Sequence, residues 1–195
     1  MKKLLYVLVF IIIIYSCTSH KYANPHVLIT TKLGDIEVEL YPKQAPKSVA
    51  AFLSYIDSGL YSSSSFYRVL NEDNQPSNAA KAKLIQGGIW QSNPNKLSTL
   101  KGIPHESTMQ TGILHKNGTI SLAREEPGTA NSEFFICIGD QPGYNYGGIN
   151  NPDKQGYAAF GRVVKGMDII LRIYNMNECS QYFQPPVPIY DIKRL

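Results

Sequence analysis

Residues 26–40 read HVLITTKLGDIEVEL and predict a β-hairpin, the first element of a β-rich fold. His26–Thr31 is rich in aliphatic and β-branched side chains, and Lys32–Asp35 supplies a short turn that contains glycine. In Ile36–Leu40 the apolar residues alternate strictly with two glutamates. Such alternation is typical of a strand that buries one face and exposes the other.

Similar short apolar runs, separated by turns, follow the hairpin. We expect further strands at Phe66–Leu70, Leu84–Trp90, Thr119–Ala123, Glu133–Ile138, Ala158–Val164 and Pro188–Lys193. With the hairpin this gives eight strands and no β-α-β alternation. The pattern favours a mainly β fold, a closed antiparallel barrel without open sheet edges. By pattern alone a β-sandwich is a serious alternative.

Two helices are predicted within this series of strands. Pro46 opens the first, and Gly59 stands where its C-terminal cap is expected. The apolar positions of the first helix, spaced as on one helical face, are Val49, Phe52, Leu53 and Ile56. The second runs from Met167 to about Asn175, with a predicted apolar stripe of Met167, Ile170, Leu171 and Tyr174. Two helices so far apart in the chain suit a barrel with one helix at each open end.

Composition excludes several classes of protein. Of 195 residues 43% are hydrophobic and 17% are charged, against the roughly 25% charged residues of ordinary soluble domains. Disorder and a coiled coil are therefore disfavoured. The low share of charged residues also argues against a basic nucleic-acid tail, and no nucleic-acid partner is expected. The net charge of +4, which falls to +2 without Lys2 and Lys3, carries no information about polyanionic partners. The sequence has neither C-x-x-C nor H-E-x-x-H, and we expect neither a metal site nor thiol-redox chemistry.

The N-terminus predicts an export signal. Met1-Lys2-Lys3 precedes the uncharged, mostly aliphatic run Leu4–Tyr15, as in a secretory signal peptide over residues 1–16. Twelve helical residues would cover roughly 18 Å, which is short of a bilayer core of about 30 Å. A permanent membrane-spanning helix is therefore the weaker interpretation.

Ile14-Tyr15-Ser16-Cys17 resembles the lipobox of bacterial lipoproteins, in which the cysteine becomes the acylated first residue. This predicts lipidation at Cys17, a lipidated tether over residues 17–25 and a folded domain over 26–195. The protein would then be held on a membrane of the bacterial cell envelope by its N-terminal lipid, facing the periplasm. The alternative is an ordinary signal peptide with an incidental cysteine.

Five segments in order resemble the cyclophilin family of peptidyl-prolyl cis-trans isomerases. They are Phe66–Leu70, Leu84–Gly88, Gly118–Arg124, Ser132–Ile136 and Gly156–Met167. The resemblance covers essentially residues 26–195. It implies a closed eight-stranded antiparallel barrel capped by two helices, in agreement with the strand count. It also implies an isomerase of X-Pro bonds that needs no cofactor and acts on proline-containing polypeptides, and we expect a monomer.

Arg68 resembles the catalytic arginine of this family. Rotation about an X-Pro bond is slow because amide resonance gives a barrier of about 18–20 kcal/mol. The two isomers differ by only about 0.5–1 kcal/mol, so the obstacle is kinetic. A fixed guanidinium can favour the twisted state, in which the proline nitrogen regains its lone pair. No nucleophile is needed.

The remaining site residues are also implied by the resemblance. Phe135 matches the aromatic residue under the proline ring, with Leu84 beside it, and Gln86 matches the glutamine that supports the arginine. Ala123 and Arg124 match a strand end whose main chain pairs with an extended peptide. The full predicted substrate-binding set is Phe66, Leu84, Gln86, Ala123, Arg124, Glu133, Phe135, Tyr144 and Tyr157.

Three departures from the family pattern bear on the site. The polar insertion 71–83 replaces a short connection, and its last residue, Lys83, stands where an aromatic is usual. Glu133 replaces a glutamine, so when ionised it can only accept hydrogen bonds. It could pair with Arg68 or Arg124, or compete with the substrate carbonyl. Tyr144 takes the place of a leucine in a loop without the family tryptophan.

We therefore predict a prolyl isomerase that accelerates the folding of exported proteins. The alternative is a catalytically weak or silent module of the same fold that binds proline-containing segments as a chaperone or assembly partner. A β-sandwich surface protein would require the five ordered segments to be coincidental.

Overall fold

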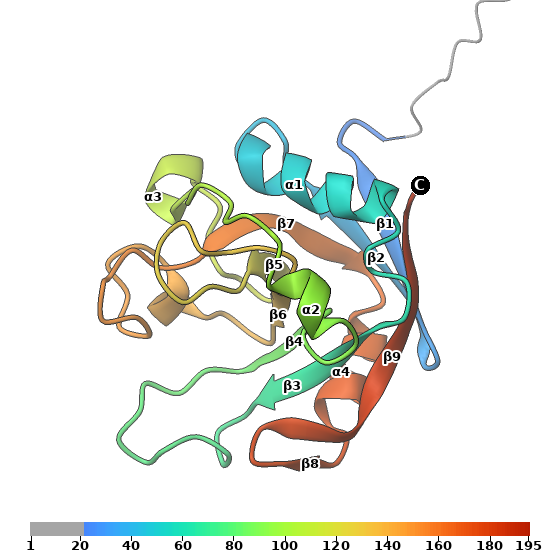
Figure 1. Cartoon of the computed structure of the whole chain (residues 1–195). Helices are drawn as coiled ribbons and strands as arrows, with labels where there is room; N and C mark the ends of the chain where they lie inside the picture. The colour runs from blue at the N-terminus through green and yellow to red at the C-terminus, as the bar shows by residue number, and fades with distance from the viewer. Residues whose placement is uncertain (1–21) are drawn as a thin grey trace, which may run out of the picture.

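The computed structural model describes residues 22–195, so the predicted signal peptide and Cys17 lie outside the described residues. Its strands are β1 (His26–Thr31), β2 (Gly34–Leu40), β3 (Ser64–Leu70), β4 (Leu84–Gly88), β5 (Thr119–Leu122), β6 (Phe134–Cys137), β7 (Ala158–Lys165), β8 (Glu178–Cys179) and β9 (Tyr182–Arg194). They form one antiparallel sheet in the order β1-β2-β7-β5-β6-β4-β3-β9-β8, and β1 also pairs with β9. This last pairing closes eight strands into a barrel, with β8 as an appendix of β9 (Figure 1). The predicted closed barrel is confirmed and the β-sandwich is excluded.

The barrel interior is filled by inward-facing side chains from each strand. One row across four neighbouring strands consists of Val69, Ile85, Ile136 and Ile120, all without exposed area. Fully buried aromatic rings pack at one end, where Phe134 makes an edge contact with Phe66 at 5.8 Å between ring centroids. Burial of these apolar side chains supplies most of the favourable free energy of folding.

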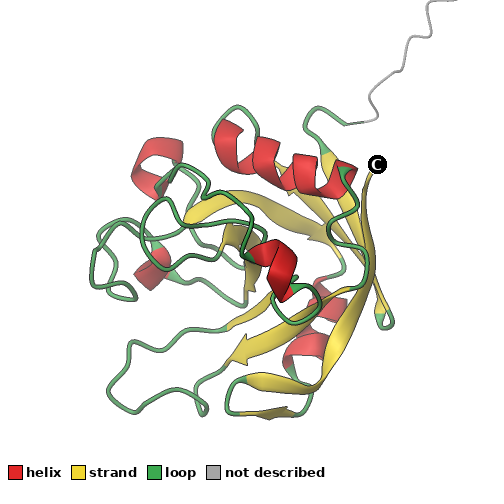
Figure 2. Ribbon diagram, in the orientation of Figure 1, coloured by secondary structure: helices red, strands yellow, loops and turns green. Residues whose placement is uncertain are grey.

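Helices α1 (Pro46–Asp57) and α4 (Met167–Tyr174) are the two predicted ones. Helix α1 contacts β7 and β9, whereas α4 contacts β2 and β4, and Figure 2 shows them on different sides of the sheet. Gly59, at φ +70°, follows the end of α1 as predicted. The short elements α2 (Pro94–Leu97), α3 (Thr108–Thr111) and η1 (Pro142–Tyr144) were not predicted, because three or four residues are too few to show a helical period.

The predicted apolar stripe of α4 is wrong in part. The helix buries Ile169, Ile170 and Ile173, whereas Leu171 is 42% exposed. The predicted stripe and the buried set both have helical spacing, because most residues of this eight-residue helix are apolar. The hydrophobic period therefore does not determine which face of the helix is buried. The β1–β2 hairpin decides it, because the side chain of Ile169 packs closely against the backbone of Gly34.

Within residues 22–195, no helix combines the length and the apolar character that crossing a membrane requires.

Candidate active site

A β-bulge in β3 determines where Arg68 points. Phe66 pairs with Gly87 of β4, but Arg68 pairs with the very next residue, Gln86, so that Tyr67 is the extra residue. Without the bulge, Phe66 and Arg68 would share a face of the strand. With it, Phe66 faces the barrel interior, while Arg68 lies on the outer surface. Bulges commonly re-aim side chains in this way beside functional sites.

The prediction that Phe66 contacts substrate is therefore corrected. Its side chain has no exposed area and belongs to the main core, where it packs on Phe134. The structure brings it into the barrel interior and not to the surface that carries Arg68.

Three predicted residues lie in one row on the outer face. Arg68 on β3 is the cross-strand partner of Gln86 on β4, which is in turn the partner of Phe135 on β6. Directly paired residues on neighbouring strands share a face, so sheet register alone places the arginine, the amide and the aromatic ring side by side.

The guanidinium of Arg68 is held at both ends by amide oxygens. Its Nη1 donates to Oε1 of Gln86 at 3.1 Å. Its Nε and Nη2 donate to Oε1 of Gln181 at 3.1 and 2.7 Å. Because a guanidinium has five N–H groups, one N–H on each terminal nitrogen is left for a ligand. Both partners are neutral, so the positive charge of Arg68 is not paired with a carboxylate in the described chain.

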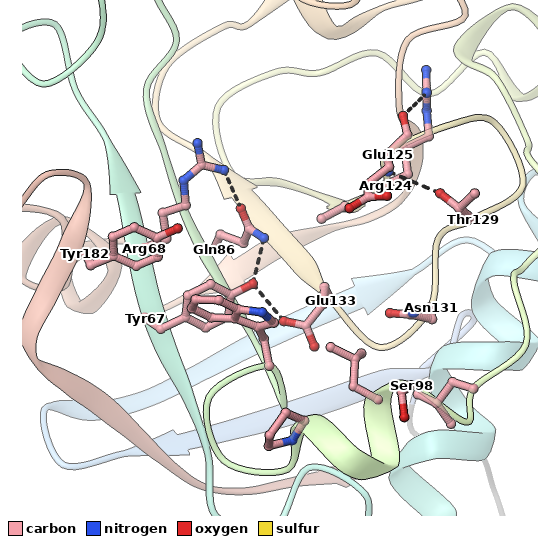
Figure 3. Close-up of a pocket in the computed structure, with 15 residues that line it drawn as sticks. Tyr67, Arg68, Gln86, Ser98, Arg124, Glu125, Thr129, Asn131, Glu133 and Tyr182 are labelled. Carbon is pink, nitrogen blue, oxygen red and sulfur yellow. Dashed lines mark hydrogen bonds between the residues drawn. The ribbon is translucent and has the colours of Figure 1, made fainter.

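A directed chain of hydrogen bonds runs from Arg68 to a buried carboxylate (Figure 3). Nε2 of Gln86 donates to the hydroxyl of Tyr67 at 2.7 Å, and that hydroxyl donates to Oε2 of Glu133 at 2.8 Å. An ionised carboxylate only accepts, which orients the Tyr67 hydroxyl and then the Gln86 amide. The carbonyl oxygen of Gln86 is thereby turned toward Arg68.

Glu133 pairs with neither Arg68 nor Arg124, so those two hypotheses are wrong. Its other oxygen accepts from the backbone N–H of Ile89 at 2.8 Å and from the hydroxyl of Ser132 at 3.1 Å. Its side chain is nearly fully buried, and burial raises the pKa of the Glu133 carboxyl despite these hydrogen bonds.

Close packing explains the two glycines after Gln86. A Cβ on Gly87 would approach Cδ1 of Phe66 to 2.9 Å, and one on Gly88 would approach the carboxylate oxygens of Glu133 to 2.4 Å. Gly88 also has φ +147°, which disfavours other residues. Phe66 therefore needs a glycine at position 87, and Glu133 needs a glycine at position 88.

An apolar cluster adjoins Arg68 on the outer face. Its buried members are Leu70, Ala82, Leu84, Phe135, Cys137 and Tyr144, against which Ala123 and Tyr157 pack. The rings of Tyr144 and Tyr157 meet edge to face at 4.8 Å, and both lie 5.3 Å from Phe135. Phe135 and Leu84 are almost fully covered, whereas Ala123 and Tyr157 are half-buried. The accessible part of the cluster is therefore formed by Ala123 and Tyr157.

A buried histidine supports this cluster from below. The ring of His115 stacks on Phe135 at 5.9 Å with an interplanar angle of 12°. Its Nδ1 lies 2.9 Å from Oδ1 of Asn145 and its Nε2 lies 3.0 Å from Oγ of Ser121. An amide oxygen only accepts, so Nδ1 carries the proton and Nε2 accepts from the serine. Burial lowers the pKa of His115 from 6.5 to about 4, so the ring is neutral.

The side chain of Arg124 faces the loop behind the cluster and not the open surface. It forms two hydrogen bonds with Asp153, at 2.7 and 3.0 Å, and also donates to the carbonyl of Gly156. Its guanidinium carbon lies 5.2 Å from the ring centre of Tyr157. Arg124 thus holds the segment that presents Tyr157. Its main chain follows the end of β5, beside the backbone of Ala123, as expected for pairing with a peptide.

A cavity of about 710 Å³ opens beside Arg68 and reaches the apolar cluster at Ala123. Arg68, Gln86 and Glu133 line it together with an aromatic group of Tyr67, Trp90 and Tyr182. Trp90 lies 5.2 Å from Tyr67 and 5.7 Å from Tyr182 between ring centres, and it is 43% exposed. Arg68 therefore lines this cavity and also adjoins the Phe135 cluster, and Ala123 belongs to both.

The insertion 71–83 is closed by side-chain amides. Nε2 of Gln75 donates to the carbonyls of Asn71 and Ala82 across its base. Lys83 forms an ion pair with Glu72 at 2.6 Å, within the insertion. Lys83 therefore does not make the apolar cluster more polar, because Leu70 and Ala82 fill that side.

Sequence reasoning missed Gln181, Tyr67 and His115 as parts of the site. Gln181 is more than a hundred residues from Arg68 in sequence and stands in a stretch without a motif. Tyr67, next to Arg68, offered a signal in its polar hydroxyl, but only the bulge shows where that hydroxyl lies. Among residues 22–195 no three His, Cys, Asp or Glu side chains gather as a metal site, and Cys137 and Cys179 are free thiols.

Comparison with known proteins agrees with this geometry. Residues 26–194 match the family model described as cyclophilin type peptidyl-prolyl cis-trans isomerase/CLD. A peptidyl-prolyl cis-trans isomerase of Acinetobacter baylyi is 33% identical over 177 residues, covering 90% of this chain and 86% of that one. Peptidyl-prolyl cis-trans isomerase A of Dickeya dadantii is 35% identical over 151 residues, covering 77% of this chain and 71% of that one.

The fold is likewise similar to a solved structure. The crystal structure of a cyclophilin-type isomerase from Cryptosporidium parvum superimposes with a TM-score of 0.68 at 23% identity, covering 88% of this chain and 98% of that one. A second crystal structure of that protein, determined in the presence of the dipeptide Ala-Pro, gives a TM-score of 0.65. The family match and the curated relatives indicate peptidyl-prolyl isomerase activity, and this chain belongs to the cyclophilin-type peptidyl-prolyl cis-trans isomerase family.

Proposed function

We propose that Arg68 is the catalytic residue and that an extended X-Pro segment crosses the surface between the 710 Å³ cavity and the Phe135 cluster. The observation that carries this proposal is the guanidinium held by two neutral amides, with one N–H free on each terminal nitrogen. A planar fork fixed in this way can donate to the substrate without first being ordered.

The proline ring would rest on the accessible edge of the apolar cluster, beside Ala123 and Tyr157. Residues before the proline would lie along the cavity that Trp90 and Tyr182 line. The main chain at the end of β5 would pair with the extended peptide, in the manner of an added strand. In this arrangement Arg68 faces the bond that rotates.

The energetic requirement is moderate. An acceleration of five decades needs roughly 7 kcal/mol of preference for the twisted bond over the planar one. Hydrogen bonds from a charged donor to the proline carbonyl and to the re-formed nitrogen lone pair are stronger than those from neutral donors. The planar amide nitrogen of the ground state is a poor acceptor, so this interaction favours the twisted state.

The test is isomerisation of a short Ala-Pro peptide by residues 18–195, with Arg68→Ala compared with the wild type. We expect kcat/KM to fall at least tenfold in Arg68→Ala while the protein stays folded, as checked by circular dichroism. Arg162→Ala is the matched control, because that arginine is an exposed residue of β7. Binding of the peptide without turnover by the wild type would instead favour a silent module, and equal activity of Arg68→Ala and wild type would refute the role of Arg68.

We further propose that the protein is a lipoprotein, acylated at Cys17 and held on a membrane of the bacterial cell envelope, where its clients are exported, partly folded polypeptides. The support is the basic start, short apolar run and lipobox-like residues at the N-terminus. Uncatalysed prolyl isomerisation takes tens of seconds, slow enough to leave such clients exposed during folding.

A further inference from the structure

Gln181 stands in an unfavourable backbone conformation. It and Ser180 form the two-residue turn between β8 and β9, and their φ angles are +75° and +51°. Tight hairpin turns of this kind strongly favour Asn-Gly or Asp-Gly, because other residues are strained at positive φ. A strained residue that persists beside a candidate active site is a reason to examine what its side chain does.

The side chain of Gln181 is engaged at both polar atoms. Its Oε1 accepts from Nε and Nη2 of Arg68, and its Nε2 donates to the carbonyl of Asn74 at 3.0 Å. The backbone of the same residue is fixed as well, because its N–H donates to Oε2 of Glu178 and its carbonyl accepts from Val69 at 2.8 Å. The amide therefore has one orientation, with its oxygen toward the arginine.

Asn74 is in turn fixed to the barrel. Its Nδ2 donates to the carbonyl of Val69, and its Oδ1 accepts from the backbone N–H of Asn71 at the start of the insertion 71–83. Its backbone N–H in turn donates to Oδ1 of Asn71. One side of the Arg68 fork is thus held through Gln181 by the insertion, and the other side is held by Gln86.

We propose that Gln181 is a positioning residue for isomerisation, which fixes the Arg68 guanidinium against the insertion without neutralising its charge. The inference rests on the proposed catalytic role of Arg68. A glycine at 181 would relieve the backbone but release one side of the fork. A carboxylate at position 181 would also hold the guanidinium, but it would neutralise the positive charge of Arg68 that stabilises the twisted substrate.

The test compares Gln181→Gly with Ser180→Gly. Both substitutions place glycine at a positive φ in the same turn. Ser180 is exposed, and the hydrogen bonds of Arg68 in the described chain go to Gln86 and Gln181, so Ser180→Gly is the matched control. We expect Ser180→Gly to be about as stable as the wild type, because glycine relieves the strain at positive φ. We expect Gln181→Gly to stay folded, although it loses the hydrogen bonds of its side chain. We expect Gln181→Gly to lower kcat about tenfold with KM changed less than about twofold, since misplacement of a catalytic group acts on the transition state. Ser180→Gly should keep both constants.

A direct readout is the ¹⁵N–¹H signal of Arg68 Nε, assigned by its loss in Arg68→Lys. We expect its proton to exchange with solvent at least tenfold faster in Gln181→Gly than in the wild type or in Ser180→Gly. Equal kcat and equal exchange in the two glycine variants would overturn the positioning role.

The two proposals fail separately. If Arg68→Ala loses activity but Gln181→Gly behaves like Ser180→Gly, only the positioning role is wrong. If Arg68→Ala retains full activity, the proposed catalytic role is wrong and the positioning role falls with it.

Discussion

Glu133 orients the side chains around Arg68, although it forms a hydrogen bond with neither Arg68 nor Gln86. Its carboxylate ends the hydrogen-bond chain through Tyr67 and so fixes which end of the Gln86 amide faces the arginine. The cost is a negative charge in a buried position, where it is incompletely compensated. Glu133 thus acts on Arg68 through Tyr67 and Gln86, and the pH dependence of stability measures the cost of burying its charge.

The burial of Glu133 predicts a stability effect with a defined sign. Burial raises the pKa of the Glu133 carboxyl in the folded protein above its ordinary value of 4.5. In the pH window between the pKa of the unfolded chain and that of the folded protein, the folded protein keeps a proton that the unfolded chain has released. Folded-state stability therefore falls as the pH rises through this window. We expect the Tm of Glu133→Gln relative to wild type to increase between pH ~4 and pH ~8. The exposed Glu125→Gln is the control, and a difference that is constant or decreases with pH would contradict the prediction.

His115 predicts a loss of stability in acid. Its pKa falls from 6.5 to about 4 on burial, so between these values the unfolded chain takes up a proton that the folded protein does not. Stability should therefore decline as the pH falls from 6.5 to about 4, by up to about 3 kcal/mol.

Urea unfolding of wild type and His115→Gln over this range measures the effect. The stability advantage of the wild type should shrink as the pH falls. An advantage that is independent of pH would show that His115 does not titrate as inferred.

At the scale of strands and helices, tertiary contacts decide which side chains of an element are buried, because the hydrophobic period of the sequence does not. The bulge in β3 sends Phe66 inward and Arg68 outward although they are two residues apart. In α4, contact with the β1–β2 hairpin selects which of two equally spaced sets of apolar residues is buried.

The orientation of α4 is tested by a pair of alanine substitutions. Ile173 is fully buried, so Ile173→Ala should lower the free energy of unfolding by about 2–5 kcal/mol. Leu171 is 42% exposed, so Leu171→Ala should lower it by less than about 1 kcal/mol. Chemical denaturation of the two variants gives both values, and a larger loss at Leu171 would indicate that the helix presents its predicted stripe instead.

At the scale of the whole molecule, the barrel places the start of β1 beside the end of β9. The N–H of Leu195 donates to the carbonyl of His26 at 3.0 Å, which closes the β1–β9 pairing at the termini. In Figure 1 the insertion 71–83 lies on the opposite side of the barrel from this point. Asn24 and Pro25 are hydrogen-bonded to the end of β2, so the proposed lipid tether would have to precede residue 22. It would then leave the surface around Arg68 accessible to large clients.

This arrangement predicts that anchoring and catalysis are separable. We expect Cys17→Ser to move the protein from the membrane to the soluble fraction, with kcat/KM toward an Ala-Pro peptide unchanged. Cys179→Ser, at the exposed cysteine of β8, is the control and should remain with the membrane. Unchanged partitioning of Cys17→Ser would refute the lipid anchor.

The sequence by itself determined the barrel, its two capping helices and the neighbourhood of Arg68, Gln86 and Phe135. Alternating apolar residues specify strands because only a half-buried sheet uses that period, and the five ordered segments specify which barrel. Once the register is set, directly paired residues must share a face.

The tertiary structure alone decided which way these residues point and what holds them. A bulge is one extra residue in a strand and leaves no period to detect. Gln181 reaches Arg68 only because β9 lies beside β3, and Glu133 reaches Tyr67 only because Gly88 leaves room for its carboxylate. Such contacts between residues far apart in sequence depend on the closed barrel as a whole, so no local pattern could reveal them.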